Sequence, residues 1–147
     1  MSKISAKVAS IRILIADDHP VVRQGLAASL NRVPDMAVVC EASNGKEAVE
    51  LFAIHVPDVA LLDLQMPQMD GVEAIGAICE QFSNARIIIL TTFEGDEDVY
   101  RGLRAGARAY LLKDTSLEDL IHCVRAVHKG TAIGRRMHEK NHERGFQ

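Results

Sequence analysis

The chain has 147 residues, of which 48% are apolar and 25% are charged, and its net charge is −3. A chain of this length and composition forms one globular domain that buries roughly two-thirds of the surface of the unfolded chain. The weak negative charge gives no general case for binding nucleic acid, no stretch approaches the about 20 apolar residues of a membrane span, and the N-terminus lacks the apolar region of a secretory signal. We therefore expect a cytoplasmic protein without membrane contacts.

Segments with the pattern of strands and segments with the pattern of helices alternate five times along the chain. Short β-branched and aliphatic runs predict strands, in chain order Ile11–Ala16, Met36–Glu41, Val59–Asp63, Arg86–Thr91 and Ala107–Leu112. A segment of helical period follows each strand, in chain order Pro20–Leu30, a helix that begins after Asn44, Gly71–Glu80, Asp96–Ala105, and a helix from Ser116 to about Lys129.

Strict alternation with short connections predicts parallel strands covered by helices on both faces, which is the α/β class. Five such units are too few for a closed eight-unit barrel, so we expect an open, doubly wound sheet in a single domain over residues 11–130. Residues 1–10 precede this domain as an extension. Residues 131–147 are polar and basic without an apolar period, and we expect this tail to be disordered.

In an open parallel sheet, ligands bind beside the carboxyl ends of the strands. Six polar residues stand at such ends: Asp17 and Asp18 follow the first strand, Asp63 ends the third, Thr91 and Thr92 stand at the end of the fourth and Lys113 follows the fifth. Because the carboxyl ends of parallel strands meet at one edge of the sheet, we expect these side chains to converge.

Three carboxylates at one edge repel one another, and a divalent cation relieves that repulsion. Mg²⁺ favours one or two carboxylates together with waters and phosphate oxygens, and the backbone carbonyl of Gln65 adds a further oxygen in this expectation. Lys113 supplies a fixed positive charge and Thr91 a hydroxyl donor. A cation, an ammonium and a hydroxyl around one carboxylate are what phosphoryl transfer needs, so Asp63 is the predicted nucleophile of an aspartyl phosphate.

Taken singly, each of these residues also has an ordinary structural explanation. An Asp at a strand end most often caps the next helix or turn, and the pair Asp17–Asp18 could cap the helix that begins at Pro20. Thr91 could be a β-branched strand residue, and Lys113 a solvent-facing side chain. The joint arrangement favours a site, because the residues fall after the same end of four different strands.

Four separated stretches of the chain resemble one family. LIADDHPVVRQGL, DLQMPQMDG, TTFEGDEDVYRGLRAGARAYLLKD and the final helix resemble the receiver domain of two-component response regulators, and within it the NarL/FixJ (LuxR-type) subfamily. The resemblance covers residues from about 10 to 130. It implies a flavodoxin-like (βα)5 fold with strand order 2-1-3-4-5. It also implies a phosphoacceptor switch rather than an enzyme, with self-catalysed phosphorylation and dephosphorylation at most.

The resemblance implies a role for each residue of the site. Asp63 would accept a phosphoryl group from a partner histidine kinase, or from a small phosphodonor such as acetyl phosphate. Asp17 and Asp18 would bind Mg²⁺ together with Asp63 and the backbone carbonyl of Gln65. Lys113 would pair with a phosphoryl oxygen.

Thr91 and Tyr110 would form the switch that reports phosphorylation. Attraction between the phosphoryl group and the Thr91 hydroxyl would draw the loop after the fourth strand inward and open space for the Tyr110 ring. The face made by the fourth helix, the fifth strand and the fifth helix would then present a different surface. A homodimer that forms on phosphorylation is a further expectation.

The chain departs from the family pattern at two places. Many receiver domains have Pro after the Lys, with a cis bond between them, whereas Asp114 follows Lys113 here, so the bond could be cis or trans. Only 18 residues follow Lys129, too few for the helix-turn-helix output domain of LuxR-type regulators. The expectation is therefore either a truncated transcription regulator, which would contact DNA only through an output domain absent here, or a single-domain regulator that acts through protein contacts.

Three competing functions have weaker support. His138-Glu139-Lys140-Asn141-His142 has the HExxH spacing of zinc peptidases, but it lies in a polar stretch with almost no chain left for a third ligand. An aspartate-nucleophile phosphohydrolase of the haloacid-dehalogenase kind usually has its nucleophile after the first strand, where adjacent Asp17 and Asp18 stand instead. A receiver-like binding module without phosphorylation usually lacks one of the functional residues, all of which are present.

Overall fold

The computed structural model describes residues 10–92 and 97–130, which contain the whole sheet and all but four residues of the predicted domain from Ile11 onward. Three parts of the sequence-based prediction lie outside the described residues. They are the N-terminal extension apart from Ser10, the tail with its HExxH motif, and Asp96, the expected first residue of the fourth helix.

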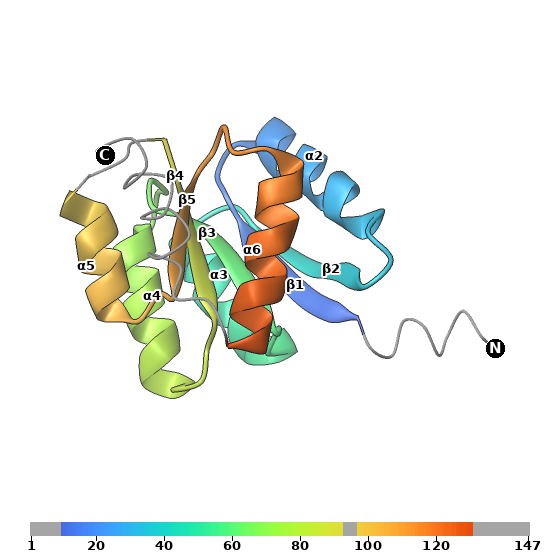
Figure 1. The fold of residues 1–147 in the computed structure, drawn as a ribbon. Coiled ribbons are helices and arrows are strands. Elements are labelled where there is room, and N and C mark those ends of the chain that lie inside the picture. The colour runs from blue at the N-terminus through green and yellow to red at the C-terminus, as the bar shows by residue number, and fades with distance from the viewer. Residues whose placement is uncertain (1–9, 93–96, 131–147) are drawn as a thin grey trace, which may run out of the picture.

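Five parallel strands form one sheet in the order β2-β1-β3-β4-β5 (Figure 1). The predicted α/β class and the strand order 2-1-3-4-5 are thereby confirmed. The strands are β1 (Ile11–Ala16), β2 (Met36–Ala42), β3 (Val59–Asp63), β4 (Ile87–Thr91) and β5 (Ala109–Leu112). β1 and β3 have the predicted bounds, whereas β5 begins two residues later than predicted.

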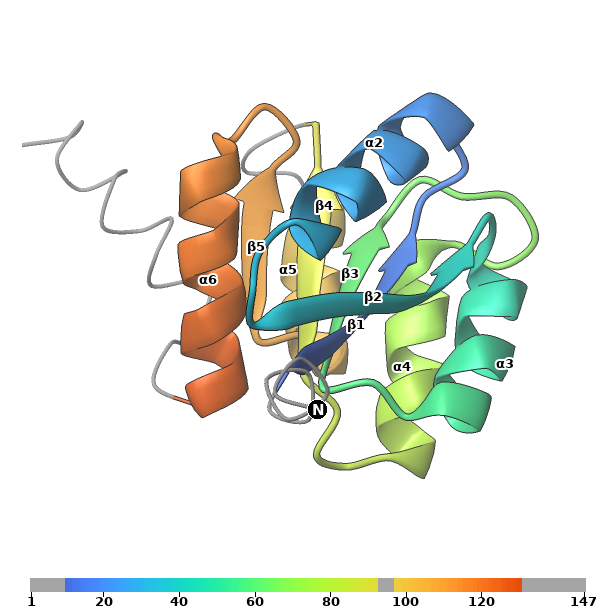
Figure 2. The ribbon, with the colours of Figure 1, turned by 90° about the vertical axis from the view of Figure 1, so that its right-hand side faces the viewer.

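Helices cover both faces of the sheet. They are α2 (Pro20–Asn31), α3 (Gly45–His55), α4 (Gly71–Gln81), α5 (Glu97–Ala105) and α6 (Leu117–Lys129). α2 and α6 pack on one face, and α3, α4 and α5 pack on the other (Figures 1 and 2). No helix among residues 10–92 and 97–130 is both long and apolar enough to cross a bilayer.

The alternation of side chains along the strands produces one apolar core on each face. Ile13 and Ile15 of β1 join the core under α2 and α6, while Leu14 and Ala16 of the same strand join the core under α3, α4 and α5. All five residues of β3 are buried. A strand buried on both faces is rigid, and a side chain at its end is held in a fixed position.

The register of the sheet brings the carboxyl ends of its strands together. Ala16, the last residue of β1, is paired with Leu62, so Asp17 follows beside Asp63. Thr91 at the end of β4 is paired with Leu112, so Lys113 follows β5 at the same edge. The residues predicted to converge are therefore at neighbouring strand ends.

Candidate functional site

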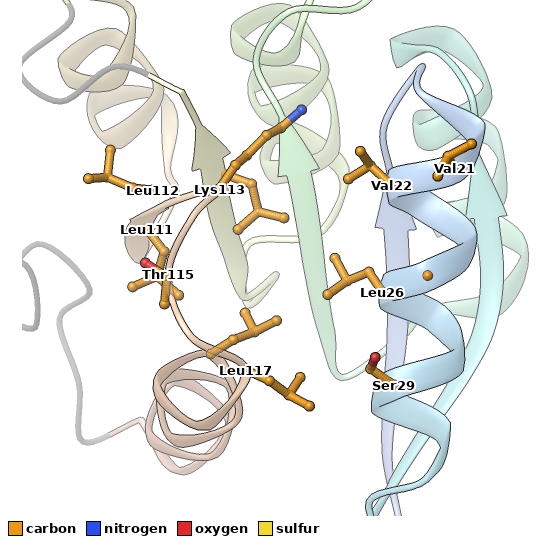
Figure 3. Close-up of a pocket in the computed structure, with 12 residues that line it drawn as sticks. Val21, Val22, Leu26, Ser29, Leu111, Leu112, Lys113, Thr115 and Leu117 are labelled. Atoms are coloured by element: carbon orange, nitrogen blue, oxygen red, sulfur yellow. The ribbon is translucent and has the colours of Figure 1, made fainter.

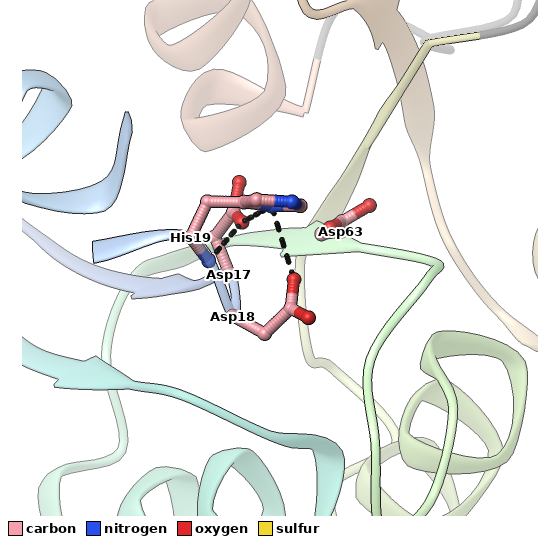
Figure 4. A group of neighbouring side chains, drawn as sticks. All are labelled: Asp17, Asp18, His19 and Asp63. Carbon is pink, nitrogen blue, oxygen red and sulfur yellow. Dashed lines mark hydrogen bonds and ion pairs between the residues drawn. The ribbon is translucent and has the colours of Figure 1, made fainter. Parts of the chain in front are cut away.

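Two buried carboxylates face each other at this edge of the sheet. The Asp17 side chain is 1% exposed and that of Asp63 is 3% exposed. The third carboxylate, that of Asp18, lies at the rim with 32% of its side chain exposed (Figure 4). Buried carboxylates need compensating partners, since each costs several kcal/mol, on the order of the desolvation penalty of an ion, when it is left alone.

Lys113 is the shared counter-charge of the buried pair. Its Nζ lies 2.9 Å from Asp17 Oδ2 and 3.1 Å from Asp63 Oδ2, and the Lys113 side chain is 17% exposed. The Lys113 backbone N–H donates to the carbonyl of Thr91 at 2.8 Å, which fixes the start of the β5–α6 loop against β4. The peptide bond between Lys113 and Asp114 is trans, as are all peptide bonds of the described residues, which settles the alternative that the sequence left open.

Each buried carboxylate also orders the turn that follows it. Asp17 Oδ1 accepts a hydrogen bond from the backbone N–H of His19 at 2.9 Å, and Asp63 Oδ1 accepts one from the backbone N–H of Gln65 at 3.2 Å. Both are turns in which an Asp side chain binds the backbone two residues on. One oxygen of each carboxylate is thereby used for local structure, and the other contacts Lys113.

His19 belongs to the site, although the sequence gave us no reason to include it. Its Nδ1 lies 3.0 Å from Asp17 Oδ1 and 3.1 Å from Asp18 Oδ1. The position of His19 at the N-cap of α2, directly after the acidic pair, was the available signal, because an extended N-cap residue stays next to the strand end that precedes it.

Arg23 is a second residue that the sequence analysis did not select. Its guanidinium donates to the backbone carbonyl of Asp17 at 2.7 Å and to Glu41 Oε1 at 3.1 Å. Arg23 therefore ties the loop that carries Asp17 and Asp18 both to the first turns of α2 and to the end of β2.

The pKa values of the two buried carboxyl groups shift in opposite directions. Burial raises the pKa of Asp63 above its usual value, and the Gln65 N–H and Lys113 offset only part of this increase. Burial also acts to raise the pKa of Asp17, but hydrogen bonds from Lys113 and His19 outweigh it, so the pKa of Asp17 is lowered. Burial acts to lower the pKa of Lys113, but its bonds to the two carboxylates raise it. Asp17 and Lys113 are thus stably charged, whereas the charge on Asp63 is the strained one.

The loop between β3 and α4 is tightly constrained next to Asp63. Gln68 and Met69 both have positive φ (51° and 91°), and the carbonyl of Gln68 accepts a hydrogen bond from the N–H of Lys46 at the start of α3. A Cβ added at Gly71 would meet the carbonyl oxygen of Asp63 and Cα of Leu64, both at 2.6 Å. The loop therefore returns to the strand end so closely that only glycine fits.

The two residues expected to form the switch lie on the two strands beside the site. Thr91 is buried (4% exposed) at the end of β4. Tyr110 is half-buried in β5, where it is paired with Ile89 and packs against the core under α3, α4 and α5. The structure thus places Asp17, Asp18, Asp63 and Lys113 in one contact group, with Thr91 joined to it through the backbone of Lys113.

The donor set of the pocket fits a divalent cation. Single atoms of Asp17, Asp18, His19 and Asp63 lie within 4.8 Å of one another. Asp17 Oδ2 and Asp18 Oδ1 are fully buried, and their neighbours are Lys113 Nζ at 2.9 Å and His19 Nδ1 at 3.1 Å. Three carboxylates that share one ammonium are a favourable place for a cation, and oxygen ligands are those that Mg²⁺ prefers.

An apolar groove of about 370 Å³ begins beside this pocket, with Lys113 at its end (Figure 3). Val22 and Leu26 of α2 form one wall, and residues of β5, of the loop that follows it and of the start of α6, including Leu117, form the other. Val21 is 84% exposed and Leu117 is 42% exposed. Lys113 thus lines both the acidic pocket and an exposed apolar surface.

A five-stranded parallel sheet whose carboxyl edge carries an acidic pocket and a lysine defines a receiver-type phosphoacceptor fold. Residues 13–125 match the family model of the response regulator receiver domain. The chain belongs to this family, as its sequence predicted, and its relatives are response regulators of the NarL/LuxR type.

Relatives and solved structures agree on this assignment. The chain is 48% identical over 120 residues to the transcriptional regulatory protein LiaR of Bacillus subtilis, and the aligned residues cover 82% of this chain and 57% of LiaR. It is 42% identical over 120 residues to the nitrate/nitrite response regulator protein NarL of Escherichia coli K12, again over 82% of this chain and 54% of NarL. A LuxR-family two-component response regulator from Aurantimonas sp. SI85-9A1 superposes with a TM-score of 0.82 at 31% identity, over 94% of this chain and 99% of that one. The chain therefore spans about half the length of the curated relatives it matches.

Proposed function

We propose that Asp63 accepts a phosphoryl group from a partner histidine kinase, or from a small phosphodonor such as acetyl phosphate. The observation that carries this proposal is the contact between Lys113 Nζ and Asp63 Oδ2 at 3.1 Å, in a pocket where Asp17 shares the same ammonium. An Asp63 oxygen attacks phosphorus, the bond from phosphorus to the donor's leaving atom breaks, and the donor departs with that electron pair. Lys113 then turns from the carboxylate to a phosphoryl oxygen, which takes over its counter-charge.

Mg²⁺ would be held by Asp17, Asp18, Asp63 and the backbone carbonyl of Gln65. When bound, the cation neutralises charge on the phosphoryl oxygens and aligns them for transfer. The side chains of the site set the charges around the reacting carboxylate. Lys113 and His19 lower the pKa of Asp17 and so favour its ionised form, while Asp18 lies at the rim with 32% of its side chain exposed. Burial raises the pKa of Asp63, so the negative charge at this position, including that of the acyl phosphate, would need the cation and Lys113 as counter-charges.

Phosphorylation would be reported through Thr91 and Tyr110. A phosphoryl group adds about two negative charges and new acceptor oxygens at Asp63. The hydrogen bond from the Lys113 backbone N–H to the Thr91 carbonyl couples the ends of β5 and β4. A shift of Lys113 towards the phosphoryl group would therefore also move Thr91. Inward movement of Thr91 then leaves space for the Tyr110 ring and changes the surface made by α5, β5 and α6. A homodimer that forms on phosphorylation is part of this proposal.

The partner kinase would approach over the apolar groove. A phosphohistidine on a protein must be brought next to Asp63, and Lys113 lies at the junction of groove and pocket. Exposed aliphatic side chains on both sides of the groove, Val21 and Leu117, offer the kind of contact that a helical partner buries.

The output would be control of transcription in the cytoplasm. The curated relatives named above are transcriptional regulators or response regulators, and this chain matches about half of their length. DNA would be contacted only through an output domain beyond the receiver. Regulation through protein contacts of the receiver alone is the alternative, and binding of the full-length protein to promoter DNA separates the two.

Intact-mass measurement tests the proposed phosphoacceptor. The chain incubated with Mg²⁺ and acetyl phosphate should gain the mass of one phosphoryl group, and Asp63→Asn should abolish the gain. Asp119→Asn on the exposed side of α6 is the matched control and should be phosphorylated like the wild type. Absence of a mass gain in wild-type chain that has bound the cation would refute the proposal, and repeated turnover of ordinary phosphomonoesters would point to a phosphohydrolase.

A further inference from the structure

His19 is the one nitrogen donor in an otherwise all-oxygen cluster. Its Nδ1 lies 3.0 Å from Asp17 Oδ1 and 3.1 Å from Asp18 Oδ1, and the ring lies over both carboxylates (Figure 4). We propose that His19 supplies a nitrogen ligand to the divalent-cation site, so that the pocket binds first-row transition-metal dications such as Co²⁺ and Zn²⁺ in preference to Mg²⁺. This inference rests on the cation site of the proposed function and names a ligand and a selectivity for it.

The spacing of the three atoms suits adjacent ligands of one ion. Metal–ligand bonds of about 2.1 Å place neighbouring ligand atoms of an octahedron about 3.0 Å apart. The two distances from Nδ1 have this value, and one oxygen of Asp63 lies within the same 4.8 Å cluster. Small adjustments therefore suffice for one ion to contact the imidazole and the carboxylates together.

The tautomer that binds an ion is clear from the geometry. Nδ1 is the ring nitrogen that lies next to the carboxylates, 3.0 Å from Asp17 Oδ1. With a cation, Nδ1 presents its lone pair to the ion and the ring carries its proton on Nε2. The His19 side chain is 62% exposed, so water can solvate that N–H. The imidazole and the two carboxylates then share one dication.

The selectivity follows from the chemistry of the donors. Carboxylate, carbonyl and water oxygens suit Mg²⁺, whereas imidazole suits Zn²⁺ and the later first-row ions. Mg²⁺ gains little from a nitrogen ligand because it is a hard cation that retains its waters. A site made of carboxylates plus one imidazole therefore strengthens the binding of Co²⁺ or Zn²⁺ more than that of Mg²⁺. Asp17 is the anchor of this site, since its carboxylate is buried and fixed by Lys113.

Replacement of His19 should leave the fold intact. The His19 side chain makes no capping hydrogen bond to α2, which begins with Pro20. Asn is among the best N-cap residues, and its amide offers an oxygen in the place of the imidazole nitrogen. The His19→Asn variant therefore replaces nitrogen by oxygen at a position that tolerates the change.

Cobalt binding to the full chain tests the proposal. All variants should carry His138→Ala and His142→Ala, because the HExxH spacing of the tail is itself a potential metal site. In this background, the proton NMR spectrum with Co²⁺ should show one strongly shifted, exchangeable ring N–H resonance. His19→Asn should remove this resonance and lower the Co²⁺ affinity relative to the Mg²⁺ affinity at least about tenfold, the scale typical of weakened histidine ligation. His122→Asn on the exposed side of α6 is the matched control and should retain both the resonance and the affinity ratio.

Failure of this inference can be told apart from failure of the cation site. If Co²⁺ binds in competition with Mg²⁺ but the resonance is absent and His19→Asn leaves the affinity ratio unchanged, the nitrogen ligand is refuted and the oxygen site stands. If neither ion binds more weakly to Asp63→Asn than to the unsubstituted background, the cation site of the proposed function is refuted together with the inference.

Discussion

The Lys113 ammonium contacts Asp63 at 3.1 Å, although 50 residues separate the two in the chain. The contact depends on the sheet, because β3 and β5 lie on opposite sides of β4 and the Lys113 side chain reaches across its end. The same ammonium contacts Asp17 at 2.9 Å. One ammonium thus neutralises two buried carboxylates only in part, and the site without a metal ion has an excess of negative charge, which the proposed divalent cation would compensate.

The excess charge predicts that Asp63→Asn stabilises the cation-free protein. Burial raises the pKa of Asp63, which means that its ionised form is disfavoured in the folded state at neutral pH. An amide removes this charge while keeping the shape, and Lys113 retains Asp17. We expect the free energy of unfolding to rise by about 1 kcal/mol, the usual scale of one substitution, in urea titrations with a chelator present.

Asp17→Asn is the matched control for that measurement and should have the opposite sign. The pKa of Asp17 is lowered because hydrogen bonds from Lys113 and His19 outweigh its burial, so its ionised form stabilises the folded state. The amide should reduce the free energy of unfolding by about 1 kcal/mol or more. Equal effects of the two substitutions would contradict the different roles assigned to the two carboxylates.

The same pKa shifts predict how stability depends on pH. A carboxyl group whose pKa is raised on folding contributes stability that is present below its unfolded pKa of 3.8 and lost as pH rises through its folded pKa. The advantage of Asp63→Asn over the wild type should therefore shrink as the pH falls from neutral towards 3.8. Asp17 behaves in the reverse sense, since its contribution is lost only as the pH falls below 3.8 through its lowered pKa. Urea titrations at several pH values, with chelator, measure both trends.

The cation should stabilise the wild type by mass action. A ligand that binds only the folded state adds RT ln(1 + [L]/Kd), about 2.7 kcal/mol when its concentration is 100 times Kd. Addition of Mg²⁺ should therefore raise the melting temperature of the wild type by several degrees, on the scale of a few kcal/mol in a domain of this size. Asp17→Asn should show a much smaller rise, and Asp119→Asn should respond like the wild type. An equal response of all three would place the cation elsewhere.

The ends of the strands could be predicted from the sequence, because a run of apolar residues shows where a buried strand begins and ends. The contacts of flexible side chains could not be predicted in this way. Val59–Asp63 is an unbroken buried run that ends on a charge, and its predicted bounds are those of β3. β5 begins later than predicted because the N–H of Ala107 donates a hydrogen bond to the carbonyl of Gly102 in the preceding turn. The apolar side chain of Ala107 gives no sign of this turn in the sequence. His19 and Arg23 are polar residues at the start of a helix, where exposure is the ordinary outcome. Their contacts with the acidic loop arise from side-chain rotamers that no periodic pattern encodes.

Gly71→Ala should damage both stability and phosphorylation. The added Cβ would lie 2.6 Å from the carbonyl oxygen of Asp63 and from Cα of Leu64, so the backbone beside the proposed phosphoacceptor must move. Overpacking of this kind costs about 1–3 kcal/mol. Gly76→Ala in the same helix is the matched control, because nothing lies within 4 Å of its added Cβ. It should stabilise the protein by about 0.5–1 kcal/mol through helix propensity. Urea titrations and intact-mass phosphorylation assays check both; a harmless Gly71→Ala would contradict the tight loop.

Val21→Asp should separate transfer from the kinase from the chemistry at Asp63. Val21 is 84% exposed, lines the groove and is not one of the residues of the acidic cluster, so acetyl phosphate should still phosphorylate the variant at the wild-type rate. A charge in the apolar contact should slow transfer from the phosphorylated partner kinase at least about tenfold, since loss of an interface contact of 1.4 kcal/mol has that effect. Ile54→Asp is the matched control, because Ile54 is 71% exposed on α3, which covers the other face of the sheet. Equal transfer rates for Val21→Asp and Ile54→Asp would show that the kinase docks elsewhere, while loss of the reaction with acetyl phosphate would show that Val21 supports the site itself.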